Sequence, residues 1–254
     1  MVLAFPTTVE QYTETDDINL PGEERLSDSP FVERVWYSRS DDGGAFISSA
    51  ESHWEMVITK YRDETTLTVR GPETRATPAF SPPDAEFCGI VFKPGAFMPS
   101  FPINKVMDRQ DINLPRASSK SFWLNGAAWQ FPNFENADSF VSRLVREDML
   151  VYDPLINVVL QEQSHSVSRR TMQRRFLQAT GLTYAQMYQI QRARYATSLL
   201  KRGLSILDVV DTAGYSDQPH MTRALKHLMG QTPAQIANRN VTAPMSFLFK
   251  TPPF

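Results

Sequence analysis

Cysteine is almost absent from this chain, since Cys88 is the only one among its 254 residues. A single thiol excludes an internal disulfide framework and fits a reducing compartment. The chain also has no run of about 18 apolar residues, so no membrane-spanning helix is expected. Residues 1–15 lack the basic start and the apolar run of a secretory signal peptide. Together these absences predict a cytoplasmic protein with no membrane partner.

Motifs of catalysis and of metal binding are missing as well. No nucleophile–base pair or phosphate-binding loop is recognisable, and His53, His165 and His227 lie far apart without the spacing of metal ligands. Cys88 stands in an apolar run, where a cysteine is most often inert, and a redox sensor would need a lowered thiol pKa. The sequence therefore predicts no enzyme, no metal and no cofactor.

A short sequence repeat occurs twice between residues 153 and 240. Residues 168–187 match residues 217–236 when they are shifted by 49 positions. Met172 then falls on Met221, and Arg174 falls on Arg223. Self-similarity at a fixed offset is typical of two copies of one supersecondary unit.

Each copy has the pattern of two helices joined by a turn. The predicted helices are 155–161 and 169–179 in the first copy, and 206–212 and 218–229 in the second. Ser168 and Asp217 stand at N-cap positions, where a side-chain oxygen can accept an orphan backbone N–H. Gly181 and Gly230 stand just past the helix ends, where a left-handed residue is favoured. Both copies are therefore interpreted as helix-turn-helix units.

The second helix of each copy has an apolar face and a polar face. The apolar positions recur at i, i+4 and i+7, which predicts a narrow buried stripe. The polar face carries arginine and glutamine, which can make paired hydrogen bonds to guanine and adenine edges in the DNA major groove. The residues predicted to contact bases are Arg170, Gln173, Arg174, Gln218, His220 and Arg223. The alternative is that these arginines and His220 are ordinary solvated side chains.

Charge is distributed unevenly along the chain. Residues 153–240 hold eleven basic and five acidic side chains, a balance of +6, whereas the whole chain has −2. A basic module on an acidic body indicates that one end binds a polyanion. The residues predicted to contact DNA phosphates are Ser168, Arg169, Arg175, Thr183, Lys226 and Thr232. Phosphate contacts supply much of the affinity, and base contacts supply the specificity.

The order and spacing of these residues resemble a known family. The matching segments are Ser168-x-Arg170-x-Met172-x-Arg174-x-Phe176, Gly181-x-Thr183, Arg192-x-x-x-Ala196-x-x-Leu199-Leu200, Ser205-Ile206, Ala213-Gly214-Tyr215-Ser216-Asp217-Gln218-x-His220-x-x-Arg223 and Gly230-x-Thr232-Pro233. Over about its last 90 residues the chain resembles the arabinose-regulator (AraC/XylS) family of bacterial transcription factors. It departs from that pattern at Val210, where Ala is usual, at Leu225, where Phe is usual, and in the missing turn glycine of the first copy.

The resemblance implies a sequence-specific transcription regulator with two recognition helices in successive major grooves, about 34 Å apart on one face of the DNA. The long helix predicted at 184–202 would set the separation of these two helices. Double-stranded DNA, RNA polymerase and a small-molecule effector are the partners considered. The rival interpretations are a β-barrel enzyme fused to a DNA-binding tail, a protein-interaction module, and a regulator whose N-terminal domain only contacts another protein.

The N-terminal part has the pattern of β-structure. Short runs rich in aromatic and β-branched residues are separated by turn signals, which indicates a small antiparallel barrel or a double sheet. The predicted strands are 31–37, 45–49, 54–60, 65–70 and 87–93, and a helix is predicted at 136–150. Phe92-Lys93-Pro94-Gly95 resembles the sensor domains of some family members, which implies a jelly-roll-like barrel. The expected fold class is α+β, with this barrel followed by an all-α domain that holds both helix-turn-helix units.

The sequence thus predicts four segments. These are an acidic N-terminal arm at 1–30, a β-rich sensor or dimerisation domain at 31–152, a DNA-binding domain at 153–240 and a proline-containing tail at 241–254. A homodimer is expected to form through the N-terminal domain or through helix 136–150. Trp36, Trp54, Phe87 and Phe92 are candidates for an effector pocket, and the alternative is that they belong to a plain hydrophobic core.

Overall fold

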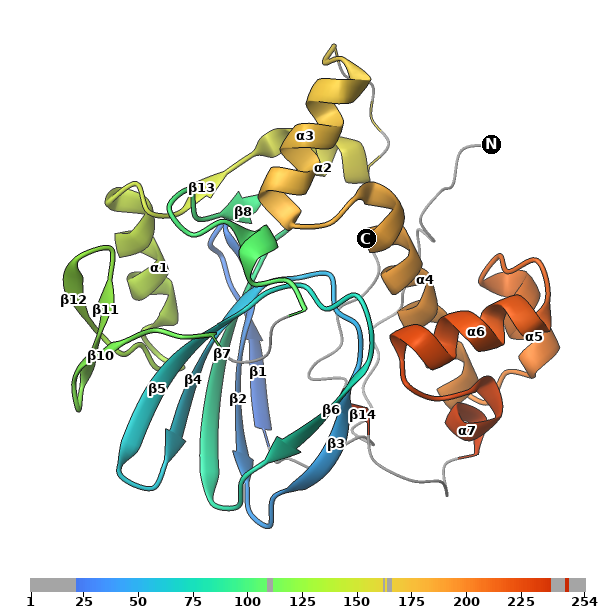
Figure 1. The fold of residues 1–254 in the computed structure, drawn as a ribbon, viewed down its shortest axis with the longest axis horizontal. Coiled ribbons are helices and arrows are strands. Elements are labelled where there is room, and N and C mark those ends of the chain that lie inside the picture. Colours follow the sequence, from blue (N-terminus) through green and yellow to red (C-terminus); the bar gives the residue numbers. More distant parts are fainter. Residues whose placement is uncertain (1–21, 109–111, 162, 164–165, 239–244, 247–254) are drawn as a thin grey trace.

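A region of β-sheets precedes a region of helices in the computed structural model of the chain (Figure 1). The structure describes residues 22–108, 112–161, 163, 166–238 and 245–246. We call residues 22–152 the sheet region and residues 153–238 the helical region. Each has a hydrophobic core of its own, although Ala50, from the sheet region, belongs to the core of the helical region.

The sheet region is built around an antiparallel sheet of six strands. In spatial order they are β1 (Gly22–Leu26), β2 (Val32–Ser40), β7 (Ala85–Phe92), β4 (Glu55–Tyr61), β5 (Glu64–Arg70) and β9 (Ile112–Asn113). Apolar and β-branched side chains such as Val35, Met56 and Ile90 are fully buried. Trp36 lies opposite Gly89, and a Cβ on Gly89 would stand 2.0 Å from the indole. Glycine is therefore required at this position of β7 so that the indole can lie against the strand.

The remaining strands form smaller sheets. β3 (Gly44–Ser48) pairs with β6 (Thr77–Ser81) and with β14 (Met245–Ser246), while β8 (Ala96–Phe97) pairs with β13 (Val151–Tyr152). β10 (Arg116–Ser118), β11 (Ser121–Leu124) and β12 (Ala127–Gln130) form an antiparallel meander. In the part of the chain that the structure describes, these sheets stay separate and do not close into a barrel, so the barrel prediction is not confirmed.

One helix completes the sheet region. α1 (Ala137–Arg146) buries Phe140, Val141 and Leu144 against the core, beside the meander (Figure 1). The sequence predicted a helix as far as residue 150, but Asp148 adopts a left-handed backbone conformation with φ of 54°. This conformation ends the helix, because a left-handed residue cannot continue a right-handed turn. A single 3-10 turn, η1 (Ile103–Lys105), lies against the helical region.

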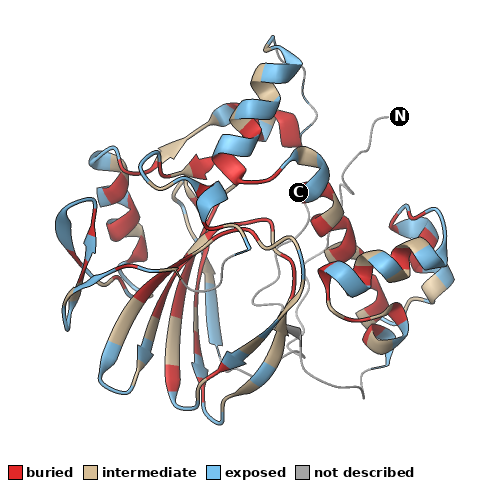
Figure 2. Ribbon diagram, in the orientation of Figure 1, coloured by how far each residue is buried: buried red, intermediate tan, exposed pale blue. Residues whose placement is uncertain are grey.

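The helical region contains six described helices. They are α2 (Pro154–Leu160), α3 (Arg169–Thr180), α4 (Tyr184–Lys201), α5 (Ile206–Thr212), α6 (Gln218–Leu228) and α7 (Pro233–Ala237). Buried residues line α4 over its whole length (Figure 2), because it packs against α3 and against α5, α6 and α7. The bounds of α2, α3, α4 and α6 differ from the predicted ones by at most one residue at either end, and those of α5 are the predicted ones. Of the helices that are described, none is long and apolar enough to span a membrane.

Two parts of the termini differ from the sequence predictions. Within the predicted arm, Gly22–Leu26 is strand β1, which Arg25 ties down through an ion pair of 2.7 Å with Asp138 and a hydrogen bond to the Phe134 carbonyl. Within the predicted tail, Met245–Ser246 is strand β14 and runs parallel to β3. The remainder of the predicted arm up to residue 21, and residues 239–244 and 247–254, lie outside the described residues.

Candidate nucleic-acid interface

The N-terminal ends of α3 and α6 are capped in the same way. The Thr171 N–H donates to Ser168 Oγ at 3.3 Å, and the His220 N–H donates to Asp217 Oδ1 at 2.6 Å. That His220 N–H also holds the pKa of the Asp217 carboxyl below its ordinary value. The Asp217 carboxylate is therefore ionised at neutral pH, and its negative charge interacts favourably with the positive end of the helix dipole. Both N-cap assignments made from the sequence agree with this geometry.

Both helices present one apolar and one polar face. Phe176 and Ala179 in α3, and Met221 and Leu225 in α6, are buried in the core of the helical region. The predicted base-contacting residues Arg170, Gln173, Arg174, Gln218 and Arg223 are exposed, whereas His220 is half-buried. The polar faces of α3 and α6 are therefore accessible from solvent.

His220 differs from the other five predicted base-contacting residues because neighbouring residues hold its ring. Its Nδ1 lies 3.1 Å from Ser216 Oγ, and its ring meets Tyr215 edge-on at a centroid distance of 5.3 Å. Tyr215 in turn lies under the guanidinium of Arg192, whose Cζ is 4.1 Å from the centre of the phenol ring. Arg192 also donates to the Gly214 carbonyl at 3.2 Å. Arg192 therefore fastens the turn before α6 to α4.

The predicted phosphate-contacting residues fall into three groups. Ser168, Arg169 and Lys226 are exposed, and the Lys226 ammonium donates to the Gly230 carbonyl. Thr183 and Thr232 cap α4 and α7, where each hydroxyl accepts the N–H of the residue three positions later. The third group is Arg175 alone, which forms an ion pair with Asp153.

Arg175 is paired with an acidic residue, and its side chain stays partly exposed. Its guanidinium forms two hydrogen bonds with the carboxylate of Asp153, one of them of 2.7 Å from Nε. The same carboxylate caps α2 by accepting the Leu155 N–H at 3.0 Å. A bidentate pair of this kind competes directly with a phosphate for the guanidinium. We therefore interpret Arg175 as a residue that joins α2 to α3.

The helical region matches a known family. Residues 163–239 fit the family model described as "Helix-turn-helix domain". The matched span contains α3 and α6 with both N-caps, and it includes the motif residues that resemble the AraC/XylS pattern. Residues 163–239 are a helix-turn-helix domain of the AraC/XylS type. Residues 162, 164 and 165, which fall in the predicted turn of the first copy and include His165, lie outside the described residues.

Two curated proteins show similarity to this AraC/XylS-type domain. The HTH-type transcriptional regulator RipA of Corynebacterium glutamicum is 35% identical over 88 residues, which cover 34% of this chain and 27% of that protein. RipA of Corynebacterium diphtheriae is 32% identical over 104 residues, which cover 40% of this chain and 31% of that protein. The chain thus spans less than a third of the length of either relative.

A solved structure also resembles the chain weakly. ToxT from Vibrio cholerae matches over 86% of this chain and 98% of its own, with 11% identity and a TM-score of 0.38. A likeness of this size supports no conclusion about the sheet region. The assignment to the AraC/XylS type therefore rests on the helical region alone.

The four aromatic residues proposed for an effector pocket do not come together. Trp54 and Phe92 stack with their ring centroids 3.9 Å apart inside the main core of the sheet region. Trp36 and Phe87 belong to a separate cluster. Because Trp36, Trp54 and Phe92 are also fully or almost fully buried, the plain-core alternative describes these residues better.

Cys88 is buried in the sheet-region core. Burial raises the pKa of its thiol to about 12. A thiol that stays protonated at neutral pH is a poor nucleophile, so Cys88 does not have the properties of a redox sensor. Among the described residues, no three histidine, cysteine, aspartate or glutamate side chains are grouped so that they could hold a metal ion.

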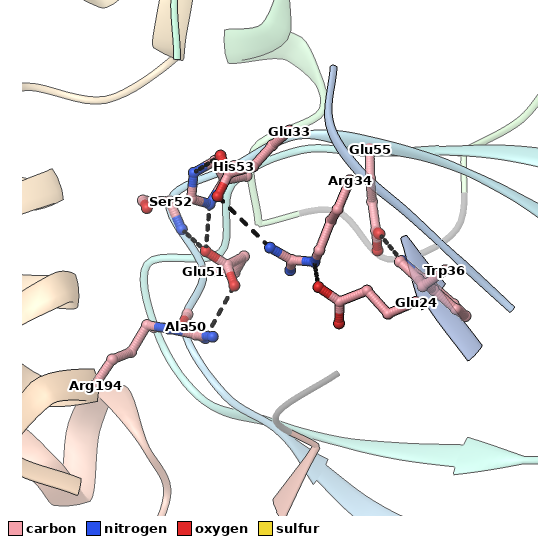
Figure 3. Close-up of polar contacts among 10 residues, drawn as sticks. All are labelled: Glu24, Glu33, Arg34, Trp36, Ala50, Glu51, Ser52, His53, Glu55 and Arg194. Atoms are coloured by element: carbon pink, nitrogen blue, oxygen red, sulfur yellow. Dashed lines mark hydrogen bonds and ion pairs between the residues drawn. The ribbon is translucent and has the colours of Figure 1, made fainter. Parts of the chain in front are cut away.

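A cluster of charged residues that the sequence did not reveal lies between the sheet region and the AraC/XylS-type domain. Arg194 of α4 pairs with Glu51 at 2.9 Å, and Glu51 also lies 2.9 Å from Nδ1 of His53. The other ring nitrogen of His53 lies 3.2 Å from Glu33 (Figure 3). The residues lining the adjoining cavity, of about 60 Å³, include Glu73 and Arg194. No sequence motif predicts this cluster, because its members come from separate strands, loops and a helix.

Charge pairing controls ionisation in this cluster. Burial alone would raise the pKa of Glu51, but Arg194 and His53 outweigh it and hold this pKa well below its ordinary value. Burial lowers the pKa of His53, but Glu33 and Glu51 outweigh it and raise this pKa to about 9. The Glu51–His53–Glu33 chain is therefore fully charged near neutral pH.

Glu73, which lines the cavity beside the cluster, titrates near neutral pH. Burial raises its pKa to about 7, against the opposing effects of the Ser48 hydroxyl and Arg70. Folded protein keeps this proton up to about pH 7, while the unfolded chain releases it near pH 4.5. The contribution of Glu73 to the free energy of unfolding is thus fully present below pH 4.5 and is lost as the pH rises to 7.

In the parent protein we expect the free energy of unfolding to fall by about 1–3 kcal/mol from acidic pH to pH 7 because of this group. We expect Glu73→Gln to abolish this fall. The glutamine keeps an acceptor for Ser48 and cannot ionise. Urea unfolding of parent and variant across pH 4.5–7 measures the difference. Parallel curves for the two proteins would contradict the prediction.

Proposed function

We propose that the protein is a DNA-binding transcription regulator that reads its site with α3 and α6. The observation that carries this proposal is the equivalence of the two helices inside a helix-turn-helix domain. Each has a capped N-terminal end, a buried apolar stripe and an exposed polar face, at positions related by the offset of 49 residues. Arginine and glutamine on such a face suit base edges in a major groove.

In this proposal the helical region contains two helix-turn-helix units. The first comprises α2 and α3, the second comprises α5 and α6, and α4 joins them. Arg170, Gln173, Arg174, Gln218, His220 and Arg223 contact bases, and Ser168, Arg169, Thr183, Lys226 and Thr232 lie near phosphates. The +6 balance of residues 153–240 supports this division, because phosphate neutralisation supplies much of the affinity for DNA.

We further propose that the sheet region controls this activity by binding an effector or a partner protein. The support is its direct contact with the helical region through Glu51 and Arg194. A second copy of the chain, bound through the sheet region or α1, and RNA polymerase are further proposed partners. Similarity to regulators favours this function over an enzymatic one.

The test is the replacement of Arg174 or Arg223 with alanine. We expect each variant to bind its cognate site about 1–3 kcal/mol more weakly and to lose preference at one base position, because each arginine can pair with a guanine edge. Selection of bound sequences from a random DNA pool, followed by titration of the selected and scrambled sites, measures both effects.

The matched control is Arg146→Ala, which removes an exposed arginine of α1 in the sheet region. This variant should bind like the parent. If Arg174→Ala and Arg223→Ala weaken binding to selected and scrambled sites equally, these arginines contact phosphates and the assignment to bases is wrong.

A further inference from the structure

The C-terminal end of α6 is held by the sheet region. The last carbonyls of a helix have no partner within the helix and must find one elsewhere. Here the Ala50 N–H donates to the Leu228 carbonyl at 2.7 Å, and the Ala76 N–H donates to the His227 carbonyl at 2.9 Å. Two loops of the sheet region thus cap the helix that we propose to read the second groove.

The end of α3 receives hydrogen bonds from its own chain and packs against the sheet region. The Thr180 hydroxyl donates to the Phe176 carbonyl at 2.8 Å, and the Gly181 N–H donates to the Leu177 carbonyl at 2.9 Å. A Cβ on Gly181 would stand 3.0 Å from Cγ2 of Ile103 in η1. The end of α6 also receives two backbone hydrogen bonds from the sheet region, from residues that lie more than 150 positions earlier in the sequence.

The same loop of the sheet region also holds α4. Glu51 follows Ala50 directly, and its carboxylate pairs with Arg194 of α4 (Figure 3). The Ser52 N–H, at 2.7 Å, and His53 keep that carboxylate in place. Backbone hydrogen bonds of 3.0 Å and 2.9 Å between Glu51 and Glu73 join this loop to the one that carries Ala76. The two loops are therefore joined to each other directly.

Packing supports the same contact. Gly230 has φ of 76°, and a Cβ added to it would stand 2.7 Å from Cγ2 of Ile47 and 3.1 Å from Cβ of Ala76. The chain after α6 therefore lies close against the sheet region. By contrast, a Cβ on Gly203, at the end of α4, would meet no atom within 4 Å.

We propose that Ala50, Glu51 and Ala76 of the sheet region, together with Arg194, His227 and Leu228, form a latch that fixes α6 relative to α3. Through it the sheet region holds the second unit by hydrogen bonds and an ion pair, whereas η1 meets the first unit by packing. Arg223 and Gln218 remain exposed in the latched arrangement, so the latch positions the helix and does not cover its polar face. In this proposal the latch and α4 together set the separation of α3 and α6.

The first test needs no DNA. Glu51→Gln keeps the shape of the side chain and removes its charge. Glu86→Gln is the control, because Glu86 pairs with Lys60 between the neighbouring strands β7 and β4 and not with the helical region. In the full chain we expect Glu51→Gln to speed amide hydrogen exchange at Ala50 and Ala76 about tenfold, with no change in α3. Unchanged exchange at both amides would overturn the latch.

A second variant tests the packing. Gly230→Ala and Gly203→Ala place the same methyl group on a residue with positive φ, but only the first meets the sheet region. Exchange at Ala50 and Ala76 should therefore rise in Gly230→Ala and stay at the parent rate in Gly203→Ala. Equal exchange in the two variants would show that backbone strain, and not the contact, matters.

The second readout rests on the proposed function. On a DNA site bound by the parent, Glu51→Gln should weaken protection of the groove bound by α6 while protection of the other groove stays. An equal loss over both grooves would overturn the proposal that the latch acts on α6. If the parent protects no DNA, the proposed function fails, and the exchange measurements still decide whether the latch exists.

Discussion

Replacement of Ala196 with proline is expected to destabilise the helical region by about 3 kcal/mol or more. Ala196 is fully buried within α4, the helix against which α3, α5, α6 and α7 all pack. Proline removes the N–H at this position, and its ring clashes with the carbonyl of Arg192 one turn earlier. The kink would turn the two proposed reading helices to mismatched angles, so the loss in DNA binding should exceed that of either single arginine.

The matched control for Ala196→Pro is Ala185→Pro. Ala185 is exposed at the second position of α4, and Pro219 occupies the second position of α6. A first-turn proline removes no intrahelical hydrogen bond, so this variant should keep the stability of the parent. Footprints are compared only for variants whose circular dichroism shows folded protein. If Ala196→Pro protects both grooves as strongly as the parent does, a straight α4 is not required for the two helices to bind together.

Replacement of Phe176 with alanine is expected to lower the free energy of unfolding by about 3–5 kcal/mol. Phe176 is 1% exposed in α3, and its ring meets Tyr184 of α4 at a centroid distance of 5.9 Å. Alanine leaves a cavity in the core of the helical region where the ring had packed. Urea unfolding followed by circular dichroism measures the change.

The repeat itself provides the control for Phe176→Ala. Leu225 occupies the equivalent place in the second copy and is fully buried there, so Phe176→Leu tests a residue that this unit already uses. We expect it to cost less than Phe176→Ala, because most of the apolar volume remains. Leu177→Ala, at a position that is 43% exposed, should have little effect. Comparable losses in all three variants would contradict the assignment of Phe176 to the core.

Local signals explain why the helical region could be predicted closely. The N-caps Ser168 and Asp217 and the left-handed Gly181 act on backbone groups within a few residues, so their effect does not depend on the rest of the fold. The turn between β11 and β12 has an equally local signal. Asn125 and Gly126 both have positive φ, as a two-residue hairpin turn requires.

Partners distant in the sequence explain the contacts that the sequence did not predict. β1 became an edge strand because Arg25 finds Asp138 more than a hundred residues later. Arg175 was predicted at a phosphate, but folding brings it to Asp153. The aromatic residues proposed for one pocket are divided between two clusters, since Trp36 stands in β2, Trp54 directly precedes β4, and the two join different clusters.

The sequence by itself determined the AraC/XylS-type domain, its caps and the polar faces of α3 and α6, because periodicity and capping are properties of short segments. The open arrangement of the sheets and the latch were decided only by the tertiary structure. Glu51 and Arg194 carry no local signal in the sequence. Their role arises only when folding removes water and brings their charged partners within reach.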